Sequence, residues 1–306
     1  MGTPDFAVPC LKALISSNMN VVGVFTQPDR PRGRGNKLSP SPVKAAAEEA
    51  GIPVFQPERI RKDGAEDLKE LKPDLCVTAA FGQILSQEIL DIPKYGNINV
   101  HASLLPKHRG SAPIAHAIMA GDRETGITTM MMDAGIDTGD ILLQERTAIS
   151  ETETCGELTE RLSRIGADLL IRTIQMLTEG KLIRIPQNES EMTYDPMLDK
   201  AMGRLDFHKD AAAVRARING LNPWPCVSVP IGKERLKLLR AETFDGRGTA
   251  GTVICSDARQ GFAIACGDGA VRILEIQAPG GKRMKPEDYL RGHSISVGTD
   301  LKEEGK

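Results

Sequence analysis

The chain has 306 residues, is 40% hydrophobic and carries a formal net charge of −2. This length predicts two domains with ample cores, and the balanced composition excludes an intrinsically disordered chain. No apolar run approaches the roughly 20 residues of a membrane span, and the first residues lack the basic start and apolar core of a signal peptide.

Cysteine and histidine usage bears on compartment and metal content. The six cysteines are scattered without C-x-x-C spacing, and the five histidines form no group with ligand spacing. Scattered cysteines are typical of small, reduced, buried residues. The sequence therefore predicts a cytoplasmic protein without a membrane anchor and without a metal site.

The first half of the chain alternates between helix and strand patterns. After a turn at 2–4 we expect a helix at 5–17, a buried strand at 20–26, a loop at 27–42 and a helix at 42–50. A strand at 54–55, a helix near 65–71 and strands at 75–80 and 97–101 follow. This alternation predicts an α/β fold with a Rossmann-like, mostly parallel sheet and helices on both faces.

One element of that fold is missing from the pattern. A doubly wound sheet usually opens with an apolar strand, and no such run precedes the turn at Gly2. A start codon assigned too far downstream would explain this. A real absence would endanger folding, because the first strand is central in such a sheet.

The remaining elements divide the chain into two domains. A helix is expected at 114–120, strands at 127–132 and 141–145, and a long helix opened by the capping box Thr154–Glu157. A helix at 211–218 and alternating stretches at 226–231, 235–241, 252–255, 262–266 and 270–276 follow. We predict a catalytic domain at 1–187, a linker at 188–205 and a small, OB-like β-barrel at 206–306, with Trp224 as a core anchor between the domains.

Three polar side chains are candidates for catalysis. Asn99 and His101 stand two residues apart at the end of a predicted strand, so they share one face. Asp137 follows another strand and precedes Thr138 and Gly139. In isolation the pair would be a satisfied structural pair and Asp137 an Asx-turn residue. Together they suit acyl transfer, in which Asn99 and His101 stabilise an oxyanion and Asp137 collects a proton.

The pattern N-x-H-x-S-x-L-P at 99–106, followed by the D-T-G turn at 137–139, resembles the signature of 10-formyltetrahydrofolate-dependent formyltransferases. The resemblance implies that 10-formyltetrahydrofolate is the co-substrate. It also implies two groups of folate-contacting residues. These are Ser103, Leu104, Leu105 and Pro106 in one turn, and Phe81, Gln83, Ile84 and Leu85 beside the pterin ring.

A basic loop points to the second substrate. The run T-Q-P-D-R-P-R-G-R-G at 26–35 is similar to the insertion by which the methionyl-tRNA formyltransferase branch contacts initiator tRNA. Arg30, Arg32, Arg34 and Lys37 are the matching cations, and initiator methionyl-tRNA is the implied partner. Residues 206–306 hold 16 Lys and Arg against 13 Asp and Glu, which also fits a polyanion. The protein is expected to act as a monomer.

Three other functions use part of the same residues. Formyl transfer to a small amine would need no basic loop. Hydrolysis of formyl-folate would use the same Asn99, His101 and Asp137. A non-catalytic RNA-binding module would explain the basic loop but not the three polar residues.

Overall fold

The computed structural model describes residues 1–32 and 37–302, except for the side chains of Arg32 and Lys37. The chain forms two compact units that are interleaved in sequence. The first comprises Met1–Gly110, Thr125–Thr147 and Thr159–Tyr194, and the second Ser111–Glu124, Ala148–Leu158 and Asp195–Lys306. The three-part division expected from the sequence stays a prediction.

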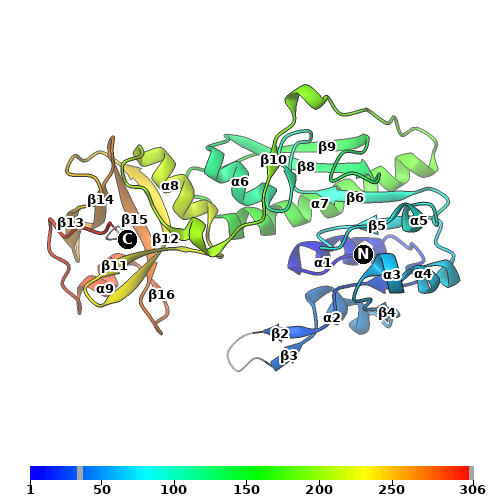
Figure 1. Ribbon diagram of the computed structural model, residues 1–306, viewed down its shortest axis with the longest axis horizontal. Helices are drawn as coiled ribbons and strands as arrows, with labels where there is room; N and C mark the ends of the chain where they lie inside the picture. Colours follow the sequence, from blue (N-terminus) through cyan, green and yellow to red (C-terminus); the bar gives the residue numbers. More distant parts are fainter. Residues whose placement is uncertain (33–36, 303–306) are drawn as a thin grey trace. The chain divides into compact units, whose positions relative to one another are not determined.

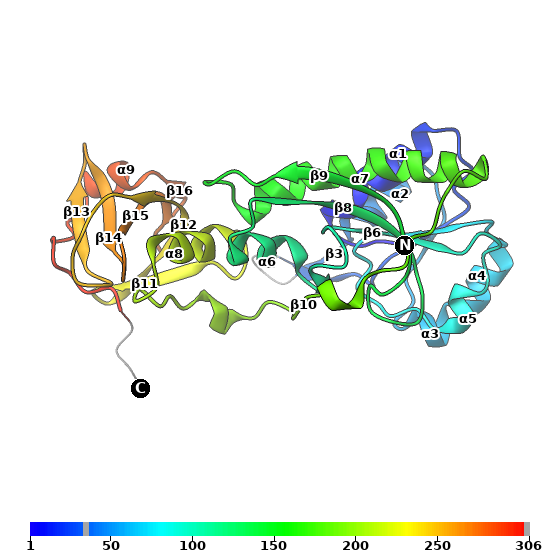
Figure 2. The same cartoon turned by 90° about the horizontal axis from the view of Figure 1, so that it is seen from above.

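The first unit is an α/β structure. Its helices are η1 (Asp5–Ala7), α1 (Val8–Ser16), α2 (Pro42–Glu49), α3 (Ile60–Asp63), α4 (Ala65–Leu71), α5 (Gln87–Leu90), most of α7 (Cys155–Thr178) and η2 (Glu189–Glu191). Its longer strands and the pair β1/β4 are β1 (Val24–Phe25), β4 (Val54–Phe55), β5 (Cys76–Thr78), β6 (Asn97–His101), β8 (Glu124–Met131) and β9 (Ile141–Ala148). Two further short pairs are β2 (Arg30–Arg32) with β3 (Lys37–Ser39) and β7 (Arg109–Gly110) with β10 (Tyr194–Asp195). Helices α1, α2 and α7 lie on one side of these strands and α3, α4 and α5 on the other (Figure 2).

Apart from the pairs β2/β3 and β7/β10, the described strands of this unit form two separate sheets. β1 pairs in parallel with β4, and β5, β6, β8 and β9 form a four-stranded sheet in that order. β5 and β6 are parallel, whereas β6 and β8 are antiparallel. The mixed α/β character expected from the sequence is confirmed, but the parallel pairing is interrupted between β1 and β5. Of the strand predicted at 20–26, only Val24–Phe25 is assigned to a strand, β1.

The loop predicted at 27–42 contains a hairpin, so that expectation is wrong in part. β2 (Arg30–Arg32) and β3 (Lys37–Ser39) are antiparallel, with Arg30 opposite Ser39. The sequence gives no sign of this pairing because charged residues and Pro31 replace the alternation of a half-buried strand.

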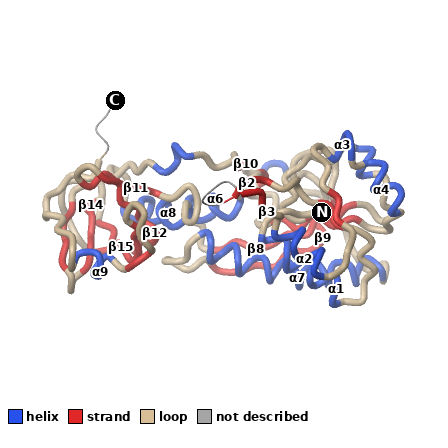
Figure 3. Tube along the Cα trace, turned by 90° about the horizontal axis from the view of Figure 1, so that it is seen from below, coloured by secondary structure: helices blue, strands red, loops and turns tan. Residues whose placement is uncertain are grey.

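The second unit is β-rich. β11 (Val227–Ile231), β12 (Glu234–Phe244), β15 (Ala270–Gln277), β14 (Gly261–Ala265) and β13 (Val253–Asp257) follow one another across a sheet, and β16 (Arg283–Met284) also pairs with β15. The five strands predicted there are confirmed. Helices α8 (Ala211–Gly220) and α9 (Pro286–Leu290) flank the sheet (Figure 3), η3 (Lys200–Gly203) precedes α8, and α6 (Pro113–Ala120) packs on α8 (Figure 1).

Trp224 does not anchor a core, contrary to the sequence-based expectation. It is 49% exposed. The core of the second unit is instead filled by aliphatic side chains together with Phe207 and Phe262. In the loop 222–225 the buried side chain is that of Asn222, two residues before Trp224. Its amide donates to the carbonyl of Leu239 at 2.7 Å. A buried polar side chain thus holds the loop in place, and the indole lies at its surface.

Candidate functional site

The candidate site is built on β6. All five residues of this strand are buried, between β5 on one side and β8 on the other. Asn99 is opposite Met130 and His101 opposite Thr128 on β8. Because side chains alternate along a strand, Asn99 and His101 point to the same face. The fully paired backbone fixes the position of both side chains.

The turn after β8 brings Asp137 to this face. Its Oδ1 lies 3.4 Å from Asn99 Nδ2 and 3.6 Å from His101 Nδ1. Its Oδ2 accepts a hydrogen bond from the backbone N–H of Gly110 at 2.9 Å. The three candidate residues therefore form one cluster, in which His101 is 6% and Asp137 14% exposed. One carboxylate oxygen faces both the amide and the imidazole, while the other is held by the backbone.

The turn itself explains why Asp137 is free to face the cluster. Asp133, not Asp137, caps the turn: its Oδ1 accepts from Gly135 N at 3.1 Å and from Thr138 Oγ1 at 2.7 Å. Asp137 has a φ of +55°, a left-handed conformation that is uncommon outside glycine. A Cβ at Gly139 would lie 1.8 Å from the carbonyl oxygen of Met131, so only glycine fits there.

A pair of residues not identified from the sequence holds this turn. Gln187 donates from Nε2 to the carbonyls of Asp137 and Gly139, both at 2.8 Å. Its Oε1 accepts from Arg109 Nε at 3.0 Å. Arg109 is 2% exposed and makes two further hydrogen bonds to the Glu189 carboxylate, at 2.7 and 3.1 Å. This chain of contacts, which we call the Gln187 clamp, fixes the backbone of Asp137 from a segment 50 residues further along.

The Nε2 atom of the His101 ring is engaged in a hydrogen bond within the protein. His101 Nε2 lies 2.9 Å from the carbonyl oxygen of His108. Because a carbonyl oxygen only accepts, Nε2 carries the proton of this hydrogen bond. His101 Nδ1 is thus the nitrogen directed at Asp137. In this geometry Asn99 Nδ2 and His101 Nδ1 both face Asp137 Oδ1.

The segment Ser103–Pro106 forms a turn directly after β6. Ser103 Oγ donates to the carbonyl of Lys107 at 2.6 Å, and Thr128 Oγ1 donates to the carbonyl of Ser103 at 2.7 Å. Leu105 is buried, whereas Leu104 and Pro106 are half-buried. These bonds fix the turn next to the cluster. The folate contacts assigned to its four residues stay a prediction.

The second folate-contacting segment lies after β5. Phe81 and Leu85 are buried in a core cluster, whereas Ile84 is 64% exposed. Gln83 accepts from Ile60 N at 2.6 Å and donates to the carbonyl of Pro57 at 3.0 Å, so its amide is engaged within the protein. Ile84 is therefore the side chain of this segment that is open to a ligand. The folate role of all four residues stays a prediction.

The basic segment is described only in part. Arg30 begins β2, and its guanidinium donates to Gln27 Oε1 at 3.2 Å. Arg34 lies outside the described residues, and for Arg32 and Lys37 only the backbone, in β2 and β3, is described. Asp29 anchors the start of the hairpin through Lys44 and Gln56, each at 2.8 Å.

The described residues contain neither a metal-binding group nor a membrane-spanning helix. Across 1–32 and 37–302, no group of three or more His, Cys, Asp or Glu is placed to hold a metal ion. Within the same ranges, no helix has the length and hydropathy needed to cross a membrane.

Known families cover most of the chain. Residues 1–174 match the formyl transferase family, and residues 197–294 match the formyl transferase C-terminal domain. Solved structures share the fold at low identity. An N-formyltransferase from Helicobacter canadensis, in complex with folinic acid and dTDP-3-aminofucose, has a TM-score of 0.66 and 19% identity, covering 92% of this chain and 97% of its own. HypX from Aquifex aeolicus, in complex with tetrahydrofolic acid, has a TM-score of 0.60 and 17% identity, covering 82% and 47%.

Curated relatives are more similar in sequence. A methionyl-tRNA formyltransferase of Geotalea daltonii is 48% identical over 302 residues, which cover 98% of this chain and 96% of the relative. Another, from Caldanaerobacter subterraneus, is 48% identical over 307 residues, covering 99% and 98%. The chain belongs to the family of the methionyl-tRNA formyltransferases.

Proposed function

We propose that the protein transfers the formyl group of 10-formyltetrahydrofolate to the amino group of methionine on initiator methionyl-tRNA. The observation that carries this proposal is that Asn99 and His101 both face the same carboxylate oxygen of Asp137. Family membership supplies the reaction class, because relatives that cover nearly the whole chain bear this activity in their names.

The cluster supplies what a direct acyl transfer needs. The uncharged amine of the aminoacyl group attacks the formyl carbon, and the carbonyl oxygen becomes an oxyanion. Asn99 Nδ2 donates to that oxyanion. Asp137 Oδ1 accepts the proton of the attacking amine, directly or through a water molecule, and an imidazolium at His101, with protons on both ring nitrogens, would hold the same carboxylate through Nδ1. The oxyanion then re-forms the carbonyl as the bond to the folate nitrogen breaks, and that nitrogen leaves with the proton that Asp137 had taken up, so no serine or cysteine nucleophile is required.

The two substrates use different parts of the chain. We assign the folate to the turn 103–106 and the segment 81–85, beside the cluster. We assign the tRNA to the hairpin cations Arg30, Arg32, Arg34 and Lys37 and to the β-rich second unit, which we take to be OB-like. Exposed Lys282, Arg283 and Lys285 lie on or next to β16 and suit contacts with a phosphate backbone. The protein would act in the cytoplasm as a monomer.

Formate incorporation tests the proposal. Purified protein is incubated with 10-formyltetrahydrofolate labelled in the formyl group and with charged initiator tRNA, and elongator methionyl-tRNA is the control. Label in the initiator aminoacyl-tRNA, with much less in the elongator, is the expected result. Label appearing only as free formate would indicate a hydrolase, and tRNA binding without folate consumption would indicate a binding module. Equal activity on small amines would overturn the assignment of the tRNA substrate.

A further inference from the structure

A three-residue backbone segment, 108–110, contacts both His101 and Asp137. The carbonyl oxygen of His108 accepts a hydrogen bond from His101 Nε2 at 2.9 Å. The backbone N–H of Gly110 donates to Asp137 Oδ2 at 2.9 Å. These are the ring nitrogen and the carboxylate oxygen that do not take part in the contact between the two side chains, which joins His101 Nδ1 and Asp137 Oδ1. The placement of the imidazole and the carboxylate therefore depends on the backbone geometry of this segment.

The segment 108–110 does not have a relaxed backbone conformation. His108 has a φ of +60° and Gly110 a φ of +111°. A positive φ is uncommon for a residue with a Cβ, and it persists where the surrounding structure fixes it. Regular secondary structure gives limited support here, because β7 contains two residues and does not include His108. Contacts from another part of the chain are needed to hold this conformation.

Thr193 provides two such contacts from 85 residues further along the chain. Its hydroxyl oxygen accepts a hydrogen bond from His108 N at 2.8 Å, and its carbonyl oxygen accepts one from Arg109 N at 2.9 Å. The two bonds hold consecutive peptide groups of the segment, one through a side chain and one through the backbone. Thr193 is exposed, so replacing its hydroxyl by a methyl group removes an acceptor with little loss of packing.

We propose that Thr193 is a positioning residue for the formyl transfer. By fixing the backbone of 108–110, it keeps the proton of His101 Nε2 on the His108 carbonyl and keeps the Asp137 carboxylate opposite Nδ1. The effect on rate rests on the function proposed above, whereas the effect on the two side chains does not. This role differs from that of the Gln187 clamp, which holds the carbonyls of the Asp137 turn.

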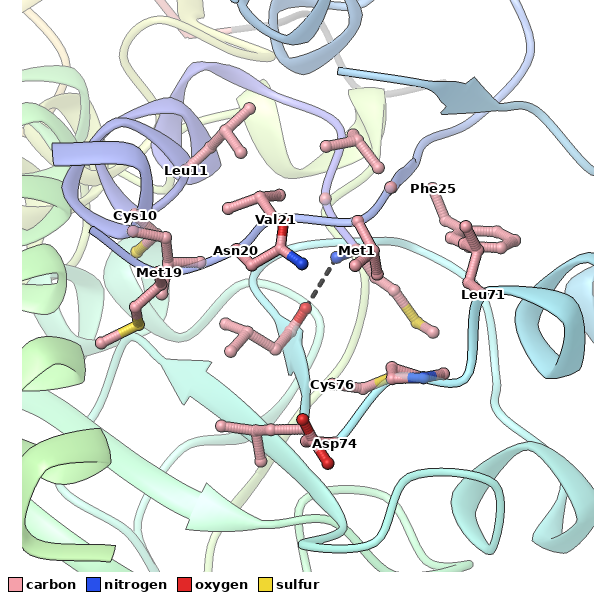
Figure 4. Close-up of a pocket in the computed structure, with 18 of the residues that line it drawn as sticks. Met1, Cys10, Leu11, Met19, Asn20, Val21, Phe25, Leu71, Asp74 and Cys76 are labelled. Atoms are coloured by element: carbon pink, nitrogen blue, oxygen red, sulfur yellow. Dashed lines mark hydrogen bonds between the residues drawn. The ribbon is translucent and has the colours of Figure 1, made fainter. Parts of the chain in front are cut away.

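Two substitutions at Thr193 and one control elsewhere test the proposal. Thr193→Val keeps the shape of the side chain but removes the hydroxyl acceptor, and Thr193→Ser keeps the hydroxyl. Leu11→Ala is the control for a general loss of stability, because Leu11 is buried and a large-to-small change there should lower Tm by several degrees. Leu11 lines a cavity of about 610 Å³, whose lining includes neither Thr193 nor any residue of the cluster or of 108–110 (Figure 4).

Two protons report on the two side chains in the absence of substrate. The Nε2 proton of His101 reports on the bond to the His108 carbonyl, and the backbone N–H of Gly110 reports on the bond to Asp137. Exchange of both protons with water is measured by NMR. The N–H of Leu105, which donates to a threonine hydroxyl of β8 at 3.1 Å, is the internal control because its bond does not involve the segment 108–110.

Thr193→Val should speed the exchange of the two reporter protons by at least about tenfold, since their bonds would open more often. The exchange of Leu105 N–H should not change. Thr193→Ser and Leu11→Ala should both leave the reporter protons as they are in the unmodified chain. Unchanged exchange of both protons in Thr193→Val would overturn the proposal, and so would equally fast exchange in Leu11→Ala.

Steady-state kinetics of the same proteins connects the protons to the reaction. Thr193→Val should lower kcat about tenfold by misplacing both side chains, with KM for folate and tRNA unchanged, and Thr193→Ser should restore the rate. Faster exchange in Thr193→Val without a change in kcat would overturn the positioning role. If the unmodified chain transferred no formyl group but showed the expected exchange, the proposed function would be wrong, and the placement of the two side chains by Thr193 would be supported.

Discussion

Two loop carboxylates of the first unit, Asp29 and Asp137, have opposite surroundings. Asp29 is paired with Lys44 at 2.8 Å and also accepts from Gln56. Asp137 has no Lys or Arg partner among the described residues, and its contacts are a backbone N–H, the amide of Asn99 and the imidazole of His101. The first carboxylate is neutralised by a fixed cation and anchors a hairpin. The second is positioned by hydrogen bonds without a Lys or Arg partner among the described residues, which suits the proton-accepting role that we propose for it.

The largest effect is expected at the oxyanion donor. Asn99→Ala should lower kcat by about 10²–10³-fold, the scale of losing one preorganised donor, while KM for folate changes little. The comparison is sharpened by Asn97→Ala on the same strand, whose amide instead donates to the carbonyl of Leu90 at 2.9 Å and should affect stability. Single-turnover rates measure the effect. An Asn99→Ala rate within threefold of that of the unmodified enzyme would show that Asn99 is not a catalytic residue.

The second-largest effect is expected at the carboxylate of Asp137. Asp137→Asn keeps the shape of the side chain but cannot take up the proton, so kcat should fall about 10²-fold. Asp133→Asn in the same turn is the matched control and should retain most activity, because that side chain only caps the turn. Comparable losses in the two variants would mean that the turn, and not the Asp137 carboxylate, is what matters.

The Gln187 clamp should have an intermediate effect. Gln187→Ala removes both hydrogen bonds to the Asp137 turn, so kcat should fall roughly tenfold by misplacement of the carboxylate, with KM for tRNA unchanged. Gln175→Ala, an exposed position on α7, is the control. Steady-state kinetics with both substrates separates the two parameters. A change confined to KM would show that Gln187 acts in substrate binding instead.

Removing positive charges from the second unit should weaken the binding of tRNA without changing the catalytic rate. Replacing Lys282, Arg283 and Lys285 by Gln should raise KM for tRNA a few-fold and leave kcat unchanged. The slope of log K against log salt should fall by roughly one unit for each lost phosphate contact. The measurement is tRNA affinity across a salt series. A salt slope equal to that of the unmodified protein would place the tRNA elsewhere.

The smallest effect is expected at Asp29. Hydrogen bonds from Lys44 and then Gln56 hold the pKa of Asp29 below its usual value. A lowered pKa in the folded state contributes stability that is present above about pH 4 and is lost as the pH falls through the folded-state pKa. Asp29→Asn should therefore lower Tm by about one or two degrees at pH 7 and flatten its decline in acid. Thermal unfolding measured from pH 7 to pH 3 checks this. A decline of Tm in acid equal to that of the unmodified protein would contradict the prediction.

Local patterns in the sequence predicted much of this arrangement. Asn99 and His101 were predictable because a two-residue spacing on a strand fixes a shared face. The five strands of the second unit were predictable from alternation. Gln187 was not, because its contacts depend on a segment that returns to the turn from 50 residues away. The interruption between β1 and β5 agrees with the expectation, drawn from the lack of an apolar run before the turn at Gly2, that the first strand of the sheet is missing.

The Gln187 clamp also sets when the site is complete during synthesis. Chains emerge from the ribosome with the amino terminus first, and domains fold as their residues appear. Asn99, His101 and Asp137 are all made before Gln187 and Glu189, the two members of the clamp that lie furthest along the chain. A nascent chain that stops at residue 174 would contain the whole matched N-terminal family region and still lack the hydrogen bonds from Gln187 to the backbone of the Asp137 turn. The clamp is therefore complete only when residue 189, near the end of the last segment of the first unit, has been made.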